Sequence, residues 1–385
     1  MKKKLLCIAL AFVFTVGLGL TAQAEDLALP APSCILMEKD TGQILYEENA
    51  HEKLRPASVT KIMTLLLTMD AIDSGALAYD DVVTVSANAA GMGGSQVFLA
   101  EGEQITVEEL LKCVCVSSGN DAAVALAEKV AGVTELFVEQ MNNRARGLGM
   151  DDTHFVNPTG LTAEGHVTSA HDIALMSREL IRNHPDIRQY TTIWMDTLRD
   201  GASQLVNTNR LIRFYNGATG LKTGSTDSAL YCLSGTAERD GMELISVILK
   251  APTSAQRFED AQALLNMGFS TYTLIHAVPE TPLAPVPVSL GTQATVQPVV
   301  GEGGTLVLEK ALAAGLTQTI TLAESVEAPV AAGDHLGTLQ LFSGETPVAE
   351  LPLLAGEDVP RITYREMFSR VLRTAFLCAG APSQQ

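Results

Sequence analysis

The run over residues 58–72 constrains the fold of this 385-residue chain more than any other segment, because its apolar residues wrap most of the way round a helix. A helix that is apolar on nearly all sides is stable in water only when other elements surround it. Pro56 and Ala57 directly precede the run and mark its start. We therefore predict a buried central helix at this position.

The segments around this helix predict a mixed α/β domain. Strands are expected at 33–40 and 43–48, joined by an Asp40-Thr41-Gly42 turn, and again at 228–237 and 242–250. Helices are expected at 106–131 in two pieces, 134–148, 169–183 and 254–265. Thr106 and Glu109 have the spacing of a capping box, which supports a helix start there. Because strands come first and last, we expect one sheet that joins both ends of this region.

The composition is typical of a folded protein of two or three domains, with 46% apolar and 18% charged residues. A formal net charge of −18 argues against nonspecific nucleic-acid binding through a basic surface. Residues 1–24 have three lysines, an apolar stretch and a small-x-small site, the pattern of a secretory signal. Its removal would take the net charge to −21. A retained N-terminal membrane anchor is the alternative.

Beyond this region the chain predicts a small β domain and a basic tail. Residues 279–287 contain four prolines and are expected to form a linker, followed by short strands at 305–308, 317–322 and 338–342. Residues 361–377 form an amphipathic pattern with four arginines against one glutamate. Such a helix is typical of a membrane-surface anchor, although it could instead pack on its own domain. It is too polar to span a bilayer.

The cysteines and histidines favour structural roles. Cys113 and Cys115 lie in an apolar run with poor spacing for a zinc knuckle, so we predict buried core thiols. His166 and His171 are expected on the surface, because no acid–histidine pair has the spacing of a metal site. The sequence predicts neither a metal nor a cofactor.

Three short polar motifs occur in order along the chain. Ser58 and Lys61 lie one helical turn apart, so the amine can reach the hydroxyl. A serine needs a neighbouring base to act as a nucleophile, and burial lowers a lysine pKa far enough for that task. Taken alone, Ser-x-x-Lys is also explained by a capping serine and an exposed lysine.

The other two motifs favour a catalytic role for Ser58 and Lys61 over the capping interpretation. Ser118-Gly119-Asn120 interrupts an apolar helical region, and Lys222-Thr223-Gly224-Ser225 precedes the strand expected near Ser228. Each alone is also typical of a turn or of a loop-to-strand junction. In this order, the three motifs match the set found in enzymes with an activated serine.

The set resembles the serine penicillin-recognising proteins, and within them the low-molecular-mass penicillin-binding proteins that are D-alanyl-D-alanine carboxypeptidases. The matching stretches are PASVTKIMT at 56–64, SGNDAA at 118–123, FVNPTGL at 155–161 and GLKTGST at 220–226. The resemblance covers residues 30–270 well and the remainder more loosely. It implies a β-lactamase/transpeptidase-like α/β (α+β) catalytic domain with a helical subdomain over 25–275. A linker and small β-sandwich-like domain (276–357) and an amphipathic membrane-surface tail (358–385) would follow.

The resemblance also implies roles for the catalytic residues. Ser58 would attack the D-Ala-D-Ala carbonyl and form an acyl-enzyme, and Lys61 would take the serine proton. Ser118, oriented by Asn120, would pass a proton to the departing D-alanine. Asn120 would also bind the substrate amide.

The third motif would bind the substrate. Lys222 would help to keep the Lys61 pKa low through like-charge repulsion. Backbone N–H groups of Ser58 and Ser225 would form the oxyanion hole beside Gly224. Lys222, Thr223 and Arg257 are the candidates for the terminal carboxylate, although Arg257 could also be a surface residue. Ser225 stands where some relatives carry an aromatic residue or histidine, which leaves substrate preference open.

The expected partners are peptidoglycan stem peptides, β-lactam antibiotics and, through the tail, a membrane surface. The expected location is extracytoplasmic, on the outer face of the cytoplasmic membrane. A DD-endopeptidase shares all three motifs, and a penicillin-binding sensor without turnover would also carry them. A β-lactamase is a further alternative, but no acid is convincingly placed to activate a deacylating water.

Overall fold

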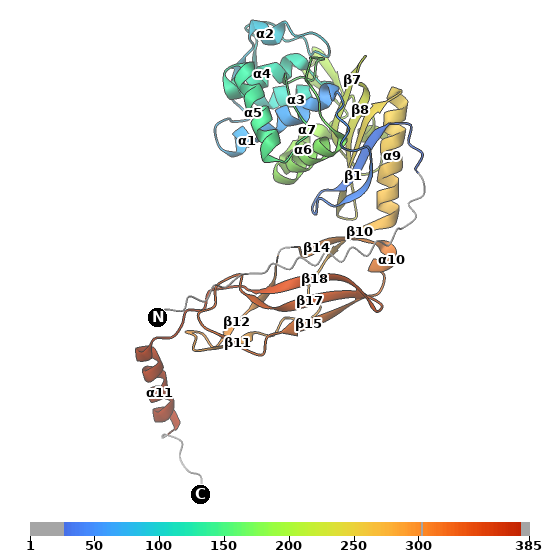
Figure 1. Cartoon of the computed structure of the whole chain (residues 1–385). Coiled ribbons are helices and arrows are strands. Elements are labelled where there is room, and N and C mark those ends of the chain that lie inside the picture. The colour runs from blue at the N-terminus through green and yellow to red at the C-terminus, as the bar shows by residue number, and fades with distance from the viewer. Residues whose placement is uncertain (1–26, 302, 379–385) are drawn as a thin grey trace, which may run out of the picture.

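The computed structural model describes residues 27–301 and 303–378. The expected signal segment, 1–24, lies outside these residues. The chain forms an α/β part (27–271), a β part (272–363) beneath it and a helix at the far end of the β part (Figure 1).

A five-stranded antiparallel sheet organises the α/β part, in the order β2-β1-β9-β8-β7. Its strands are β1 (Ser33–Glu38), β2 (Ile44–Glu48), β7 (Ala218–Thr226), β8 (Leu230–Arg239) and β9 (Met242–Ala251). Strand β1 pairs with β9, with Ile35 opposite Val247. The expectation that the first and last strands share one sheet is therefore confirmed.

Strand β7 is the main difference from the expected strands. The sequence predicted a strand that starts near Ser228, with the Lys222 motif just ahead of it in the context of an edge strand. Residues Ala218–Thr226 themselves form the edge strand and pair with β8. This strand carries two glycines, a lysine and several threonines, so it lacks the apolar alternation by which strands are recognised. The Lys222 motif consequently lies within a strand rather than ahead of one.

Helices cover both faces of the sheet. The longer ones are α1 (Lys61–Asp73), α3 (Val107–Ser117), α4 (Asn120–Ala131), α5 (Thr134–Gly147), α6 (Ala170–Asn183) and α9 (Ser254–Thr271). Alternate β9 residues point to opposite faces: Val247 packs in the core that contains α1 and α6, and Ile248 packs in the core that contains α9. The short elements are η1 (Ala57–Thr60), η2 (Pro185–Ile187), α2 (Ala87–Ala90), α7 (Arg188–Thr191), α8 (Leu211–Phe214), β3 (Val82–Thr84), β4 (Gln104–Thr106), β5 (Met195–Leu198) and β6 (Ser203–Val206).

The central helix is buried as predicted. Every residue of α1 from Lys61 to Met69 is buried, and a 3₁₀ turn, η1, forms its entry instead of a regular helical turn. The capping box between Thr106 and Glu109 is also present, at the start of α3. The buried thiols expected at Cys113 and Cys115 are confirmed.

Helix α9 continues six residues past its expected end at 265. Gly268 lies within it and faces the sheet, where a Cβ atom would come within 2.6 Å of Leu244 and 2.8 Å of Leu36. The glycine permits close packing of helix on sheet and does not end the helix.

The described residues of the β part form three small sheets. A two-stranded sheet pairs β10 (Tyr272–His276) with β14 (Thr305–Glu309). The second sheet has the order β12-β11-β16, formed by Thr295–Val296, Val286–Ser289 and Val326–Glu327. The third has the order β13-β18-β17-β15, formed by Pro298–Val300, Thr346–Ala355, His335–Ser343 and Leu316–Leu322. A one-turn helix, α10 (Lys310–Ala313), follows β14. The three expected strands correspond to β14, β15 and β17.

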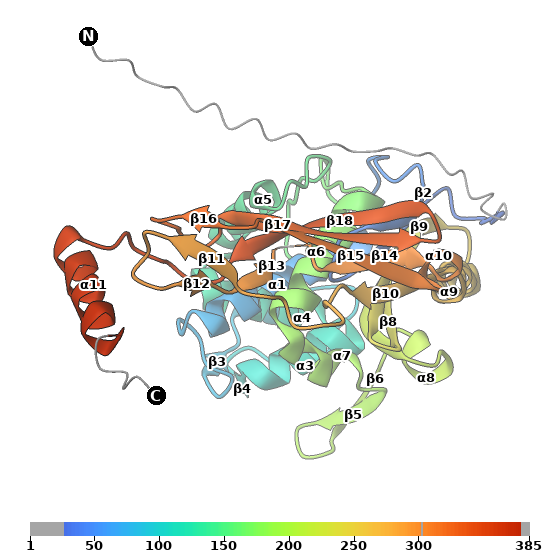
Figure 2. The same cartoon turned by 90° about the horizontal axis from the view of Figure 1, so that it is seen from below.

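The last helix, α11 (Tyr364–Cys378), projects from the end of the β part that lies away from the α/β part (Figures 1 and 2). Its apolar side chains Tyr364, Phe368 and Val371 are 92%, 67% and 61% exposed. Arg370 donates hydrogen bonds to the carbonyls of Gly291 and Thr292 on the β part. Among the helices of the described residues, none combines the length and apolarity needed to cross a bilayer.

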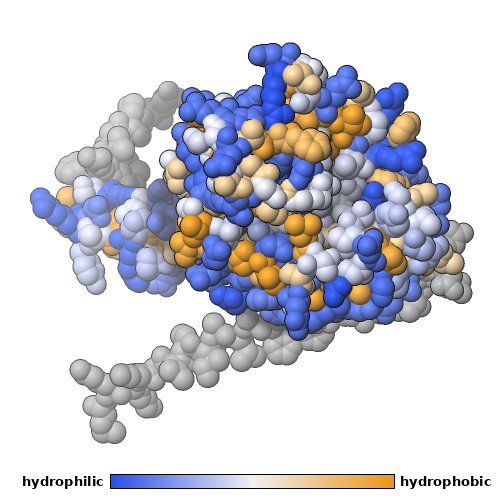
Figure 3. Space-filling model, turned by 90° about the horizontal axis from the view of Figure 1, so that it is seen from above, coloured by the Kyte–Doolittle hydropathy of each residue, from blue (hydrophilic) through white to orange (hydrophobic). Residues whose placement is uncertain are grey.

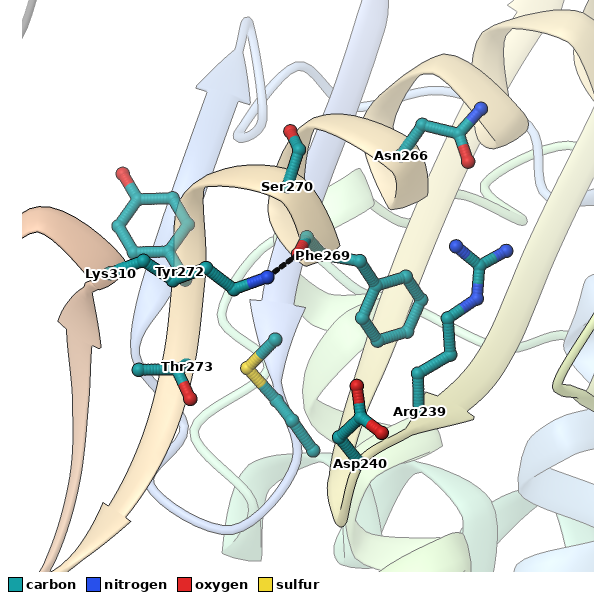
Figure 4. A pocket seen from close by; sticks show the side chains of 9 residues that line it. Arg239, Asp240, Asn266, Phe269, Ser270, Tyr272, Thr273 and Lys310 are labelled. Carbon is teal, nitrogen blue, oxygen red and sulfur yellow. Dashed lines mark hydrogen bonds between the residues drawn. The ribbon is translucent and has the colours of Figure 1, made fainter. Parts of the chain in front are cut away.

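A pocket of about 430 Å³ lies where the β8–β9 turn, the end of α9 and the β part meet (Figure 4). The Arg239 guanidinium lies over the rings of Tyr215 and Phe269, and Lys310 Nζ donates to the Phe269 carbonyl at 2.7 Å. The Lys310 bond joins the β part to the end of α9. None of the nine predicted site residues lines this pocket. Seen from above, the molecule shows hydrophobic residues in small groups among hydrophilic ones (Figure 3).

Candidate active site

The entry turn of the central helix brings Ser58 and Lys61 together. Ser58 lies in η1 and Lys61 is the first residue of α1, so their side chains share one face. Lys61 Nζ lies 2.9 Å from Ser58 Oγ. It also donates to Asn120 Oδ1 at 2.6 Å and to the Thr159 carbonyl at 2.8 Å. The amine is thus held by three oxygens from three segments of the chain.

Lys61 is fully buried and has no carboxylate among these hydrogen-bond partners. Burial lowers its pKa well below the usual value of 10.5, and the nearby positive charge of Lys222 lowers the pKa further, against a smaller opposing effect of Asp121. These surroundings favour the neutral amine over the ammonium form. Its low pKa and its position next to Ser58 together meet the requirements for a general base.

The break between α3 and α4 supplies the second motif. Ser118 ends α3 in the left-handed conformation, with φ of +59°, and α4 begins at Asn120. The Asn120 side chain bridges Lys61 and the carbonyl of Gly93, to which its Nδ2 donates at 2.6 Å. The strained Ser118 backbone turns this polar segment into the site, a placement that is common for functional residues.

Edge strand β7 supplies the third motif. Lys222 Nζ donates to Ser118 Oγ at 2.8 Å and to the Thr223 carbonyl at 3.0 Å. Burial lowers the Lys222 pKa from 10.5 to about 7. A Cβ atom on Gly224 would lie 2.8 Å from both the Pro56 carbonyl oxygen and the Ser58 backbone nitrogen. The absence of a side chain at Gly224 therefore lets β7 lie directly against η1.

The remaining predicted residues lie along β7 and behind it. The Thr223 hydroxyl contacts that of Thr208 at 2.7 Å, and Ser225 is exposed. Arg257 is buried, which excludes the alternative of a surface residue. Its Nη1 donates to the Gly224 carbonyl at 3.0 Å, so it lies at the back of the same strand. Among the described residues, Arg257 hydrogen-bonds to Gly224, Cys232 and Ser254 but not to the Ser58 or Lys61 side chain.

The turn at 157–161 is a part of the site to which sequence reasoning gave no role. Asn157 Oδ1 accepts hydrogen bonds from the backbone N–H groups of Thr159 at 3.1 Å and Gly160 at 2.7 Å. Thr64 Oγ1 donates to the Pro158 carbonyl at 2.7 Å and ties the turn to α1. These bonds present the Thr159 carbonyl to Lys61. The Asn-Pro and Gly signals predict a turn here, but only the fold shows that it meets the lysine.

A buried carboxylate fixes the loop above Asn120. Asp121 accepts hydrogen bonds from the backbone N–H groups of Val97 at 3.0 Å and Leu99 at 3.1 Å. The Asn120 backbone N–H donates to the Ser95 carbonyl of the same loop at 2.7 Å. Asp121 therefore orders the segment that holds Asn120, a role that its position next to the second motif did not reveal.

The prediction that His166 lies on the surface is wrong. It is 3% exposed, and its ring contacts Thr60 in the entry turn. Its neighbours in sequence are polar and lack periodicity, so the local pattern was typical of a loop. The burial comes from η1 and the 155–161 segment, which pack over it.

Comparisons with known proteins agree with this geometry. A family model described as D-alanyl-D-alanine carboxypeptidase matches residues 20–253, and one described as penicillin-binding protein 5, C-terminal domain, matches residues 269–361. The D-alanyl-D-alanine carboxypeptidase DacF of Bacillus subtilis is 40% identical over 356 residues, 91% of each chain. The chain belongs to the D-alanyl-D-alanine carboxypeptidase family.

Solved structures support the same assignment for both parts of the chain. Penicillin-binding protein 5 of Haemophilus influenzae aligns with a TM-score of 0.76 and 29% identity, over 86% of this chain and 98% of that one. Penicillin-binding protein D2 of Listeria monocytogenes, solved in its ampicillin-bound form, aligns with a TM-score of 0.58 and 35% identity, over 63% and 99%. The predicted resemblance and fold class are confirmed. This D-alanyl-D-alanine carboxypeptidase family member is a low-molecular-mass penicillin-binding protein, and its family of serine peptidases implies an extracytoplasmic location.

Proposed function

We propose that this chain removes the terminal D-alanine of peptidoglycan stem peptides, as a serine-type D-alanyl-D-alanine carboxypeptidase that forms an acyl-enzyme on Ser58. The observation that carries the proposal is the 2.9 Å contact between Ser58 Oγ and Lys61 Nζ, made by a buried lysine with a strongly lowered pKa. Membership of the family supports the reaction class.

The hydrogen bonds of Lys61 suit the general-base role. A neutral amine has two N–H groups and one lone pair. Asn120 Oδ1 and the Thr159 carbonyl can only accept, so they use the two N–H groups. The lone pair then faces the hydroxyl of Ser58, which can donate its proton to the amine. Ser58 Oγ is thereby activated for attack on the carbonyl carbon of the scissile amide.

The next step breaks the amide bond. Attack places a negative charge on the carbonyl oxygen, which the backbone N–H groups of Ser58 and Ser225 would stabilise. As the C–N bond breaks, the Ser118 hydroxyl gives its proton to the departing D-alanine amine. Lys222, which donates to Ser118 Oγ at 2.8 Å, can replace that proton. Water then releases the shortened peptide from Ser58.

Two cationic side chains and one hydroxyl near β7 suit the free carboxylate of the substrate. Lys222 and Thr223 lie on the strand, and Arg257 lies behind it. Within the described residues Arg257 has no carboxylate partner, and its buried Nε has no hydrogen-bond acceptor. We assign these three residues to recognition of the terminal carboxylate. Penicillins, whose strained amide resembles D-Ala-D-Ala, are expected to acylate Ser58 in the same way.

The test is covalent labelling with a fluorescent penicillin. Wild type and a Ser74→Ala control, which loses an exposed hydroxyl outside the site, should be labelled equally. Ser58→Ala should remain unlabelled while it keeps the wild-type melting temperature. Labelling of folded Ser58→Ala would contradict the assignment of the nucleophile.

We further propose that residues 1–24 direct export, that residues 25–275 form the catalytic domain, and that residues 276–357 act as a spacer. The tail at 358–385 would then hold the protein on the outer face of the cytoplasmic membrane. Support comes from the exposed apolar residues Tyr364, Phe368 and Val371 on a helix that also carries arginines.

Truncation after Pro360 tests the tail. The truncated protein should no longer sediment with vesicles of anionic phosphatidylglycerol, whereas full-length protein should. Phe368→Ser in the full chain, which keeps every arginine, should weaken sedimentation as well. Unchanged binding of the truncated protein would show that the helix is not the anchor.

A further inference from the structure

His166 is a buried imidazole beside the site that the reaction steps above do not use. Along the chain it follows the 157–161 turn and precedes α6, and its exposed fraction is 3%. Its Nε2 lies 2.9 Å from Thr60 Oγ1, and its Nδ1 lies 3.2 Å from the backbone nitrogen of Val156. The ring also meets Phe155 edge-on, with the ring centroids 5.8 Å apart. Both ring nitrogens are thus occupied.

These two contacts determine the tautomer. The backbone N–H of Val156 can only donate, so Nδ1 accepts and carries no proton. The single proton of a neutral ring is therefore on Nε2, which donates to Thr60 Oγ1. Burial, with a smaller effect of His154, lowers the pKa of His166 to about 4, so the ring is neutral at physiological pH.

The ring joins two segments that both hold Lys61. Thr60 belongs to the η1 turn between Ser58 and Lys61, and Val156 lies three residues before Thr159, whose carbonyl binds the Lys61 amine. The segments also touch directly. A Cβ atom on Gly160 would lie 1.8 Å from the Ala57 carbonyl oxygen and 2.9 Å from Thr60 Oγ1. Small changes in their separation would therefore alter the position of the amine.

We propose that His166, as its Nε2–H tautomer, is a positioning residue for acylation of Ser58. It holds the η1 turn and the Val156–Thr159 segment at the separation at which Lys61 reaches both Ser58 Oγ and the Thr159 carbonyl. It touches neither substrate nor reacting atoms, and the inference rests on the proposed function. Thr64 also ties the 157–161 turn to α1 by its hydrogen bond to the Pro158 carbonyl. Loss of the two hydrogen bonds of the His166 ring should therefore displace this turn without detaching it.

The test compares His166→Phe with His166→Gln. Phenylalanine fills the space but makes neither hydrogen bond. Glutamine offers a carbonyl oxygen to the Val156 N–H and an amide N–H to Thr60. His51→Gln is the matched control, because the His51 side chain is 63% exposed, hydrogen-bonds to Asp152 and lies against the His171 ring, away from Lys61. Stopped-flow acylation with a fluorescent penicillin separates the dissociation constant of the initial complex from the acylation rate constant, and melting temperatures are recorded in parallel.

His166→Phe should lower the acylation rate constant about 10-fold to 100-fold, the effect expected for a misplaced catalytic group, with less than about a twofold change in the dissociation constant. The acylation rate constant of His166→Gln should be within about threefold of the wild-type value. That of His51→Gln should equal the wild-type value. A purely structural role predicts equal acylation rates for every folded variant. Folded His166→Phe with the wild-type rate would overturn the proposal, as would His166→Gln that is as slow as His166→Phe.

Thr60→Val covers the case in which His166→Phe does not fold. It removes only the hydroxyl that accepts from Nε2 and nearly conserves side-chain volume. It should slow acylation in the same way, and a wild-type rate would overturn the proposal. Failure of the proposed function gives a different result: penicillin labelling of wild type would then not depend on Ser58, whatever residue occupies position 166.

Discussion

Gly224→Ala should disrupt the site without adding or removing a charged group. The new methyl carbon would lie 2.8 Å from the Pro56 carbonyl oxygen and the Ser58 backbone nitrogen and 3.0 Å from the Val59 nitrogen. Ordinary contact begins at about 3.4 Å, so β7 and η1 must separate by roughly 0.6 Å. All three opposing atoms belong to the backbone, so no side-chain rotation can relieve the contact. The strand that carries Lys222 would move relative to the turn that carries Ser58.

The expected cost has two parts. Overpacking of this kind costs about 1–3 kcal/mol, and 1 kcal/mol corresponds to roughly 2–4 °C in the melting temperature of a domain this large. A displacement of this size should also slow acylation by a fluorescent penicillin about 10-fold to 100-fold. The assay records the acylation rate constant and the melting temperature of each variant.

Gly147→Ala is the matched control. Gly147 ends α5, and a Cβ atom there would have no neighbour within 4 Å in the part of the chain that the structure describes. Its acylation rate should equal that of wild type, and its melting temperature should not fall. Wild-type acylation by Gly224→Ala would refute the claim that contact between β7 and η1 sets the geometry of the site.

Two further predictions concern the buried lysines. Lys61→Met should fold but acylate at least about 100-fold more slowly near neutral pH, because the general base is lost; a normal rate would remove Lys61 from the mechanism. Lys222 has a folded pKa of about 7, below its usual 10.5, so between these values the unfolded chain binds more protons than the folded one. The contribution of Lys222 to the free energy of unfolding should therefore rise with pH across this window, and Lys222→Met should flatten the rise measured by urea unfolding at about pH 7 and about pH 9.5. An unchanged slope would mean that the Lys222 pKa is not lowered.

Local sequence patterns predicted those parts of the fold that local physics decides. The apolar run of α1 and the capping box at Thr106 depend on residues within a few positions of one another, and both are present. The spacing of the first motif also predicted that Lys61 would reach Ser58, and the resemblance to a known family implied that the three motifs share one site. Lys61 contacts Ser58 and Asn120, and Lys222 contacts Ser118.

The remaining features depend on contacts between distant segments. Strand β7 has no apolar alternation, because its polar residues serve the site and its backbone pairs with β8. Helix α9 runs past Gly268, since that glycine packs against β1 and β9. The Thr159 carbonyl is a backbone group and carries no side-chain signal. His166 is buried by segments that lie at least five residues away in sequence, so no local pattern could reveal it.

The central claim is that Ser58 carries a carboxypeptidase reaction. The most direct test measures free D-alanine released from diacetyl-L-Lys-D-Ala-D-Ala by wild type and by Ser58→Ala at equal concentrations of folded protein. We predict steady release by wild type and none by Ser58→Ala. Equal release by the two proteins, or no release by wild type that is fully labelled by penicillin, would contradict the account.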